Sequence, residues 1–254
     1  MVLVFGGTTE GKQAIEVLTQ LQQPFIYSTK TEIKPELPDF TTYRYGALDV
    51  EGLQELINQE KIRCIVNASH PFATQLHETV DIAAKLTNIP VFRLQREFPE
   101  HSRHPLVQYL DTYNQIIELI NAKYKSKTSL FLTGVQSIAK LEPIWQSNPS
   151  FFRILDRQSS IELAMESNYA YNQLILGLPN KNKADEIELI KELSIDLIFT
   201  KESGNSGSLS VKIESAIECG IPIYILKKPD LPKSFKLVNN KEELKMSLER
   251  GVGK

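Results

Sequence analysis

The residues best suited to chemistry stand at the start of the chain, where an apolar stretch runs directly into glycines, Met1-Val-Leu-Val-Phe-Gly-Gly-Thr-Thr-Glu-Gly11. In a turn between a strand and a helix, backbone N–H groups converge and the helix dipole adds partial positive charge. The sequence therefore predicts a phosphate-binding turn, with an ordinary ligand-free turn as the alternative. Its residues are Gly6, Gly7, Thr8, Thr9 and Glu10.

Two nucleotide-binding interpretations fit this turn incompletely. Residues 6–13 come within one residue of the P-loop pattern, but Gln13 stands where a P-loop needs Ser or Thr to hold magnesium. The best candidate for a Walker-B strand, residues 62–67, ends in asparagine instead of aspartate. The dinucleotide interpretation has its own misfit, since Gly-Gly-x-x-x-Gly is not Gly-x-Gly-x-x-Gly.

The end of the next apolar segment favours one nucleotide over the others. Ser28, Thr29 and Lys30 follow the segment Phe-Ile-Tyr. An acidic residue at this point would hold the ribose diol of NAD, whereas Ser, Thr and Lys suit a 2′-phosphate. The local chemistry therefore favours NADP over both ATP and NAD.

Two polar loops follow apolar strands, where parallel sheets place their ligands. In Asn67-Ala-Ser-His-Pro-Phe72, His70 could donate a proton or bind a ligand, with a role near a helix cap as the alternative. The second loop spans residues 200–208, and the helix after it carries Lys212. Its small residues expose N–H groups, and Lys201 and Lys212 suit phosphate or carboxylate. A flexible surface loop is the alternative.

A metal site is not expected. His101 and His104 would form a metal-binding pair only on a helix, and they lie between Pro99 and Pro105. Neither cysteines nor an acidic cluster stand nearby to complete a ligand set.

Bulk properties indicate an ordinary globular protein of 254 residues, 41% hydrophobic and 24% charged. A net charge of −2 gives no reason to expect nucleic acid or anionic membrane as a partner. No apolar run approaches the ~20 residues of a membrane span. Cys64 and Cys219 stand in or beside apolar segments, which is typical of a reduced compartment. Because the sequence begins with a predicted strand, we expect no signal peptide. We expect a cytoplasmic protein.

The periodicity of the chain predicts alternating strands and helices, and hence an α/β fold with parallel sheets covered on both faces. So many strands favour two sheets over one. The basic segment 123–128 is the expected linker, giving an N-terminal dinucleotide-binding lobe over 1–124 and a C-terminal lobe over 125–254. The predicted strands are 2–5, 24–28, 42–45, 62–68, 90–94, 106–110, 129–133, 151–155, 172–176, 195–200 and 222–226.

A weak internal echo supports two lobes. Residues 65–92 and 197–224 share one layout, namely strand, polar loop, helix, turn, Ile-Pro and strand. This internal similarity reflects either a duplication or the βαβ arrangement that recurs in such folds. In both cases it predicts two similar α/β lobes with an interdomain cleft.

The motifs taken in order resemble those of the precorrin-6A reductase / cobalt-precorrin-6A reductase family of cobalamin biosynthesis. The resemblance spans residues 1 to about 230, and Ala-Ser-His-Pro-Phe-Ala is its strongest single mark. The motifs are Gly6-Gly7-Thr8-x-Glu10, Asn67-Ala-Ser-His-Pro-Phe-Ala73, Ile89-Pro90-x-x-Arg93-Leu94-x-Arg96, Leu132-Thr-Gly134 and Thr200-Lys201-x-Ser203-Gly204 with Lys212.

The resemblance implies two Rossmann-like lobes that hold NADPH in the cleft between them and reduce one ring double bond of (cobalt-)precorrin-6A, giving (cobalt-)precorrin-6B. It implies that a proton, from solvent or a side chain, completes the reduction, and the position of His70 makes it the candidate proton donor or orienter. Implied cofactor-binding residues are Gly6, Gly7, Thr8, Thr9, Glu10, Ser28, Thr29, Lys30 and Ser69. Implied substrate-binding residues are His70, Phe72, Arg93, Arg96, Lys201, Ser203, Gly204 and Lys212. The basic members of that set suit the many carboxylates of the macrocycle, and Phe72 suits its face.

The chain also departs from the family pattern. Ser28-Thr-Lys-Thr31 replaces a common Ser-x-Ala-Gly-Arg, so Lys30 would serve as a point charge without the fork of arginine. Asn67 replaces a common aspartate, Gly177-Leu-Pro-Asn180 an Arg-Gly-Pro-Phe segment, and Lys201-Glu202 a common Lys-Asn. The rival interpretations are a P-loop ATP or GTP enzyme and a non-catalytic NADP-sensing module. Whether the substrate contains cobalt stays open, as do a monomeric or homodimeric state and any neighbouring corrin-pathway enzymes as partners.

Overall fold

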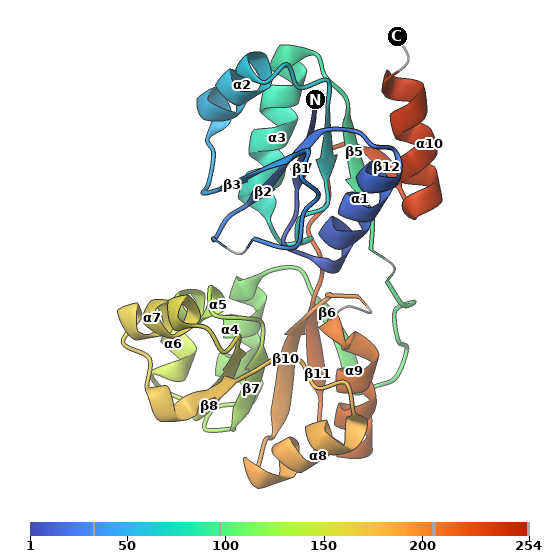
Figure 1. The fold of residues 1–254 in the computed structure, drawn as a ribbon. Coiled ribbons are helices and arrows are strands. Elements are labelled where there is room, and N and C mark those ends of the chain that lie inside the picture. The colour runs from blue at the N-terminus through green and yellow to red at the C-terminus, as the bar shows by residue number, and fades with distance from the viewer. Residues whose placement is uncertain (33, 97, 205–206, 253–254) are drawn as a thin grey trace. The chain divides into compact units, whose positions relative to one another are not determined.

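The computed structural model describes residues 1–32, 34–96, 98–204 and 207–252, in which strands and helices alternate (Figure 1). The chain forms two compact units. The first unit comprises Met1–Glu97 and Pro229–Lys254, and the second comprises Phe98–Lys228. Each unit contains its own parallel sheet with helices packed on both faces, which confirms the predicted fold class.

The sheet of the first unit has the strand order β3-β2-β1-β4-β5-β12, and all neighbouring strands are parallel. Successive side chains of a strand point to opposite faces, so Val2 and Val4 pack with α1 and α10, whereas Leu3 and Phe5 pack with α2 and α3. The bounds are β1 Val2–Phe5, α1 Thr9–Gln20, β2 Phe25–Thr29, β3 Thr41–Tyr45, α2 Val50–Gln59, β4 Cys64–Asn67, α3 Thr74–Thr87, β5 Val91–Leu94, β12 Lys236–Val238 and α10 Lys241–Val252.

The sheet of the second unit has the order β6-β11-β10-β7-β8-β9, again with parallel neighbours. Phe131 of β7 packs on the face covered by α4 to α7, while Leu130 and Leu132 pack beneath α8 and α9. The bounds are β6 Val107–Leu110, α4 Tyr113–Lys123, β7 Ser129–Leu132, α5 Ser137–Lys140, α6 Glu142–Trp145, β8 Ser150–Ile154, α7 Gln158–Glu166, η1 Tyr171–Gln173, β9 Leu174–Leu176, α8 Lys183–Glu192, β10 Leu197–Lys201, α9 Leu209–Glu218 and β11 Ile223–Leu226.

The two sheets share one topology. Starting from β3 and from β9, each follows the 3-2-1-4-5-6 order of doubly wound dinucleotide-binding folds. The strands β4 and β5 take the positions in the first sheet that β10 and β11 take in the second, which confirms the prediction of two similar α/β lobes. In such sheets ligands bind at the carboxyl ends of the strands where the order reverses. In the first unit this point lies between β1 and β4.

The two units exchange one edge strand each, β6 and β12. β6 follows β5 in sequence but pairs with β11 in the second sheet, and β12 follows β11 but pairs with β5 in the first. The predicted division into 1–124 and 125–254 therefore needs correction. The expected linker at 123–128 lies inside the second unit, where it connects α4 to β7.

The predicted strands are all present, each within two residues of its predicted bounds. The strand that the sequence does not predict is β12, with the segment Lys-Leu-Val. It is short, it lies at a sheet edge, and Lys236 and Leu237 are exposed. Only Val238 is buried, so neither alternation nor a continuous apolar run marks the segment.

Candidate functional site

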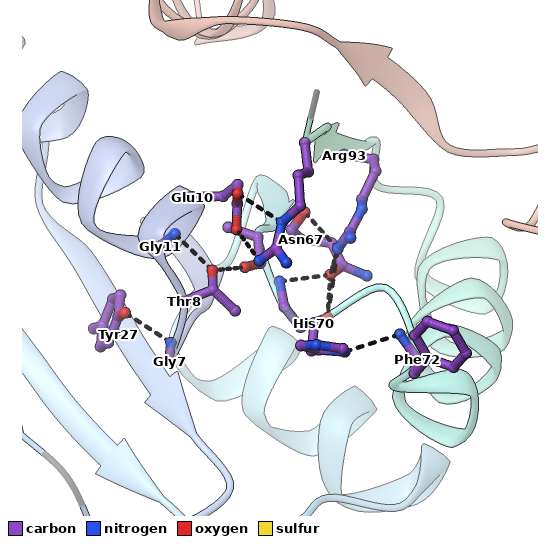
Figure 2. Close-up of polar contacts among 12 residues, drawn as sticks. Gly7, Thr8, Glu10, Gly11, Tyr27, Asn67, His70, Phe72 and Arg93 are labelled. Carbon is purple, nitrogen blue, oxygen red and sulfur yellow. Dashed lines mark hydrogen bonds and ion pairs between the residues drawn. The ribbon is translucent and has the colours of Figure 1, made fainter. Parts of the chain in front are cut away.

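The glycine turn after β1 is built around the ring of Tyr27 from the neighbouring strand β2. The Tyr27 hydroxyl accepts a hydrogen bond from the Gly7 N–H at 2.9 Å (Figure 2). A Cβ on Gly6 would lie 2.1 Å from the Tyr27 Oη, and one on Gly11 would lie 2.6 Å from it. Gly6 and Gly11 are therefore required for packing. Gly7 has a φ of +88°, and among the described residues a Cβ there would meet only Thr29 Cγ2 at 3.9 Å, so the space beside the turn is open.

We expect Gly6→Ala to destabilise the protein, because the added methyl group overlaps the Tyr27 ring. Overpacking of this kind costs roughly 1–3 kcal/mol in the free energy of unfolding. Denaturant titration of the purified variant measures the loss. In a Tyr27→Ala background the overlap is absent, so the same substitution should cost little there. An equal cost in both backgrounds would contradict the packing role of Gly6.

Thr8 joins the turn to the loop that follows β4. It is the N-cap of α1, and its Oγ1 accepts a hydrogen bond from the Gly11 N–H at 3.0 Å. The same hydroxyl donates to the Ala68 carbonyl at 2.5 Å. The Gly7 N–H is directed to Tyr27, so anion binding falls to the N–H groups that open α1, where Thr9 is exposed. These groups and the helix dipole still suit a phosphate.

Glu10 and Arg96, predicted to bind cofactor and substrate respectively, bind each other. The Arg96 Nε and Nη2 donate to the two Glu10 carboxylate oxygens at 2.9 and 2.7 Å. Both side chains are at least nine-tenths buried. Burial alone would raise the pKa of Glu10, but the hydrogen bonds and charge of Arg96 outweigh it and hold that pKa below its ordinary value. The pair is suited to fixing the start of α1 against the segment after β5.

In the loop after β4, polar groups of residues 67–72 form hydrogen bonds with one another. The Asn67 Oδ1 accepts hydrogen bonds from the Ser69 N–H at 3.2 Å and from the Ser69 hydroxyl at 2.7 Å. The exposed His70 accepts a bond at Nδ1 from the Phe72 N–H at 3.2 Å, and their rings lie 5.9 Å apart (Figure 2). A neutral His70 ring therefore carries its proton on Nε2. Pro71 is buried and Phe72 is half-buried.

Arg93 lies on β5 beside this loop, with 3% of its surface exposed. Its Nη1 donates to the Asn67 Oδ1 at 2.8 Å and to the Asn67 carbonyl at 3.3 Å (Figure 2). Burial lowers the pKa of Arg93 to about 10, against the opposing effect of the Glu10 carboxylate. The guanidinium is therefore still cationic at neutral pH. Its Nε is buried and has no hydrogen-bond partner among the described residues.

Arg44 is a candidate that sequence reasoning missed. The parallel register places it beside Ser28 at the ends of β2 and β3, and its Nη1 donates to the Ser28 Oγ at 2.6 Å. Its Nη2 donates to the carbonyls of Tyr45 and Gly46. Thr29, by contrast, is bonded within the unit through its hydroxyl, and Lys30 is exposed. The guanidinium of Arg44 therefore lies at the end of β2, where sequence reasoning identifies Lys30 alone as a positive charge for a 2′-phosphate.

The second unit presents two cations at the end of β10. Lys212 of α9 is 4% exposed, and its Nζ donates to the Thr200 hydroxyl at 3.3 Å. Burial lowers its pKa to about 8, with Glu186 opposing the shift and Arg153 adding to it. Burial, together with nearby Lys140, also lowers the pKa of Lys201 to about 8.

The rest of this second loop is tightly packed. Ser203 and Gly204 are buried, and Gly204 has a φ of +67°. A Cβ on Gly207 would lie 2.0 Å from the Ser203 Oγ, so that glycine is needed beside the serine. Asn205 and Ser206, which the sequence assigns to the same loop, lie outside the described residues.

His101, considered with His104 as a metal-binding pair, contacts a carboxylate and an aromatic ring instead. His101 bonds to the Glu202 carboxylate at 2.9 Å and stacks on Tyr109 with a centroid distance of 4.0 Å. Across the described residues, no group of three or more His, Cys, Asp or Glu side chains could hold a metal ion. Within the same part of the chain, no helix is both long and apolar enough to cross a membrane.

Comparisons with known proteins agree with this architecture. A solved structure titled CobK precorrin-6A reductase superposes with a TM-score of 0.75 at 18% identity, over 98% of this chain and 96% of that one. At that identity the likeness shows the fold alone. Among curated proteins, precorrin-6A reductase of Rhodococcus erythropolis is 28% identical over 247 residues, which cover 94% of this chain and 93% of the relative. Cobalt-precorrin-6A reductase of Methanothermobacter thermautotrophicus is 25% identical, with 91% and 77% covered.

The family comparison spans nearly the whole chain. The model described as "Precorrin-6x reductase CbiJ/CobK" matches residues 1–249. That range includes the glycine turn, both polar loops and the exchanged strands β6 and β12. The chain belongs to the precorrin-6x reductase CbiJ/CobK family.

Proposed function

We propose that this protein uses NADPH to reduce one ring double bond of precorrin-6A or cobalt-precorrin-6A in cobalamin biosynthesis. The observation that carries the proposal is the family match over residues 1–249. Curated relatives bear both the metal-free and the cobalt-containing substrate in their names, so the resemblance is equally compatible with either.

The residues of the first unit fit a nicotinamide dinucleotide. When bound, the nicotinamide supplies a hydride. The N-terminus of α1 is suited to a phosphate group, and the open space beside Gly7 lets a ligand approach the backbone there. His70 would hold a proton at Nε2, because its Nδ1 accepts the Phe72 N–H. We infer that this proton either completes the reduction or orients the macrocycle.

Cationic side chains suit the carboxylates at the rim of the tetrapyrrole. Arg93, Lys201 and Lys212 are buried or half-buried, so their charges are weakly screened and bind an anion more strongly than exposed lysines do. Arg96 is less suited to that role because its guanidinium is occupied by Glu10. Phe72 offers an aromatic face, and Ser69, Ser203 and Gly204 lie on the two loops that we assign to ligand binding.

Arg44 gives a direct test of the cofactor. We expect Arg44→Met to raise the KM for NADPH at least tenfold and to leave the KM for NADH nearly unchanged. A charge-assisted hydrogen bond to a 2′-phosphate is worth about 1.5–3 kcal/mol, and NADH lacks that phosphate. Steady-state kinetics with both nucleotides measure the effect, and Lys30→Met provides the comparison for a point charge nearby. Equal losses with both nucleotides would contradict the assignment.

The proposed activity is tested by anaerobic incubation with NADPH and either precorrin-6A or cobalt-precorrin-6A. Loss of NADPH absorbance should be matched by a product two hydrogens heavier than the substrate. The ratio of the two rates then shows whether cobalt matters. NADPH binding without consumption on either substrate would instead favour the sensing module.

The P-loop alternative is tested at Lys12. In a P-loop this lysine contacts the nucleotide phosphates, so its loss should abolish activity. Here Lys12 is exposed on α1, in the turn after the Thr8 cap. We expect Lys12→Ala to retain reductase activity within about twofold, since surface substitutions usually change little. If the folded variant had no activity, the P-loop ATP or GTP enzyme would be favoured instead.

A further inference from the structure

Arg93 is a buried cation whose direct partners are all neutral. Its hydrogen bonds go to the Asn67 carbonyl and Oδ1 and to the Ser69 hydroxyl, and in the described part of the chain its Nε has none. Within the described residues no carboxylate forms an ion pair with it, and Glu10, whose charge acts on Arg93, binds Arg96 instead. A buried guanidinium whose direct partners are all neutral is costly to desolvate, and its fork of N–H groups suits a carboxylate or phosphate of a ligand.

Asn67, at the end of β4, is the neutral side chain that binds the Arg93 guanidinium. Its Oδ1 accepts from the Arg93 Nη1 and from the Ser69 backbone N–H, and both of these groups can only donate. The amide orientation is therefore fixed: the oxygen faces Arg93 and the Nδ2 faces the other way. The Nδ2 lies 3.1 Å from the Nδ1 of His77.

The orientation of the amide in turn fixes the state of His77, which is 2% exposed on α3. Because Asn67 Nδ2 can only donate, the His77 Nδ1 must accept and carries no proton. The ring proton then sits on Nε2, which lies 3.3 Å from the Pro71 carbonyl. A protonated imidazole would set two donors against each other at Nδ1.

The surroundings of His77 agree with a neutral ring. Burial lowers its pKa to about 4, and the charge of Arg93 adds to that shift. Phe235 packs edge-on against the ring at 6.3 Å. The other charged groups close to this cluster are Glu10 and Arg96, which are paired. Among the described residues, the Glu10 carboxylate favours the charged form of Arg93 but forms no ion pair with it.

We propose that Asn67 and His77 are positioning residues that keep Arg93 fully charged for an anionic oxygen group of a ligand, a phosphate or a carboxylate. Neutral His77 holds the Asn67 amide, and the amide holds Arg93 without cancelling its charge. The identity of the ligand rests on the proposed function, where the group belongs to the dinucleotide or to the macrocycle. The side-chain arrangement itself does not depend on that function.

The first arm of the test reads the hydrogen-bond arrangement directly. Two-bond 1H–15N spectra of protein labelled at histidine report ring tautomers, and His77→Gln identifies the His77 signals among the four histidines. We expect a neutral Nε2–H ring between pH 8 and about pH 5. In Asn67→Asp, the introduced carboxylate should accept from Nδ1 and raise the His77 titration to about pH 6 or above. A wild-type ring that is charged or Nδ1-protonated at pH 7 would overturn the proposal.

The second arm measures anion binding by calorimetry with two probes, NADPH and the octacarboxylate porphyrin uroporphyrin. Asn67→Asp is isosteric but places a negative charge beside Arg93, so affinity should fall at least tenfold. His77→Leu leaves the Asn67 amide without an acceptor and should also weaken binding. His77→Gln supplies an amide oxygen for the same bond and should stay within about threefold of wild type, since the neutral hydrogen bond is restored. Melting temperatures check that each variant is folded.

The outcomes separate the two sources of the anion. A loss confined to NADPH assigns Arg93 to a cofactor phosphate, and a loss confined to the porphyrin assigns it to a substrate carboxylate. Unchanged binding of both probes by Asn67→Asp overturns the proposal, as does a wild-type protein that binds neither. If binding depends on Asn67 while precorrin-6A is not reduced, the proposed function fails and the positioning role stands.

Discussion

Replacing Lys212 with methionine should lower kcat/KM for the tetrapyrrole substrate at least a hundredfold and should also stabilise the ligand-free protein at neutral pH. The loss of activity follows from removing the buried cation that we propose binds a substrate carboxylate. Truncating one partner of a desolvated charge pair costs about 2–5 kcal/mol, and each 1.36 kcal/mol is a tenfold change.

The gain in stability follows from the environment of the ammonium. The pKa of Lys212 falls from 10.5 in the unfolded chain to about 8 in the folded protein, a difference worth about 3 kcal/mol. Below pH 8 the folded protein must hold the charged form at that cost. Methionine removes the cost and loses the bond to Thr200, worth about 1 kcal/mol, so we expect a net gain of about 2 kcal/mol.

The sign of the pH dependence makes this prediction specific. Between pH 8 and 10.5 the unfolded chain still binds the Lys212 proton and the folded protein does not, so wild-type stability rises with pH in that interval. The advantage of Lys212→Met should therefore shrink as the pH rises. Denaturant titrations at pH 7 and pH 10 measure it, with the exposed Lys191→Met as the control. A gain that is equal at both pH values would show that the buried ammonium is not its origin.

Removing residues 229–254 should prevent the first unit from folding. The deletion removes β12 from the edge of the first sheet and α10 from the face that it shares with α1. Four buried side chains go with them, and each contributes about 1.5–3 kcal/mol, together roughly 6–12 kcal/mol. That loss is comparable with the whole stability of a typical domain, about 5–15 kcal/mol. The side chains are Phe235, Val238, Leu244 and Leu248.

Circular dichroism and the yield of soluble protein measure the effect of the deletion. A pair of single substitutions separates packing from chain length. Leu244→Ala, at a fully buried position of α10, should cost about 2–5 kcal/mol. Leu237→Ala, on the 51% exposed residue of β12, should cost less than about 1 kcal/mol. A truncated chain with an intact cooperative transition for the first unit would contradict the prediction.

Much of the fold could be predicted because its signals are local. The apolar segments of β1 and β4 are buried on both faces, so they appear as continuous runs in the sequence. The glycines after β1 and the polar residues after β4 mark the strand ends that meet at the switch in strand order. The nearness of Thr8 to Ala68 is therefore implied by topology before any contact is seen.

The remainder depends on contacts between distant residues. Arg44 reaches Ser28 through strand register, and Arg96 reaches Glu10 across 86 positions of the chain. Periodicity reports burial and says nothing of such partners. The exchange of β6 and β12 is hidden for the same reason. A strand segment looks alike whichever sheet it joins, so composition indicates a linker at 123–128 and gives no sign of where the chain crosses between units.

The exchanged strand β12 has a consequence for biosynthesis. The ribosome makes β1 to β5 first, but the strand that completes their sheet follows the whole of the second unit. At about 5–20 residues per second, the roughly 140 intervening residues take about 7–28 seconds to make, and the hydrogen-bonding edge of β5 stays exposed for that time. An uncovered strand edge is a site of unwanted association between nascent chains. The second sheet avoids that exposure, because β6 emerges before its partner β11. The unit that is begun first is therefore finished last.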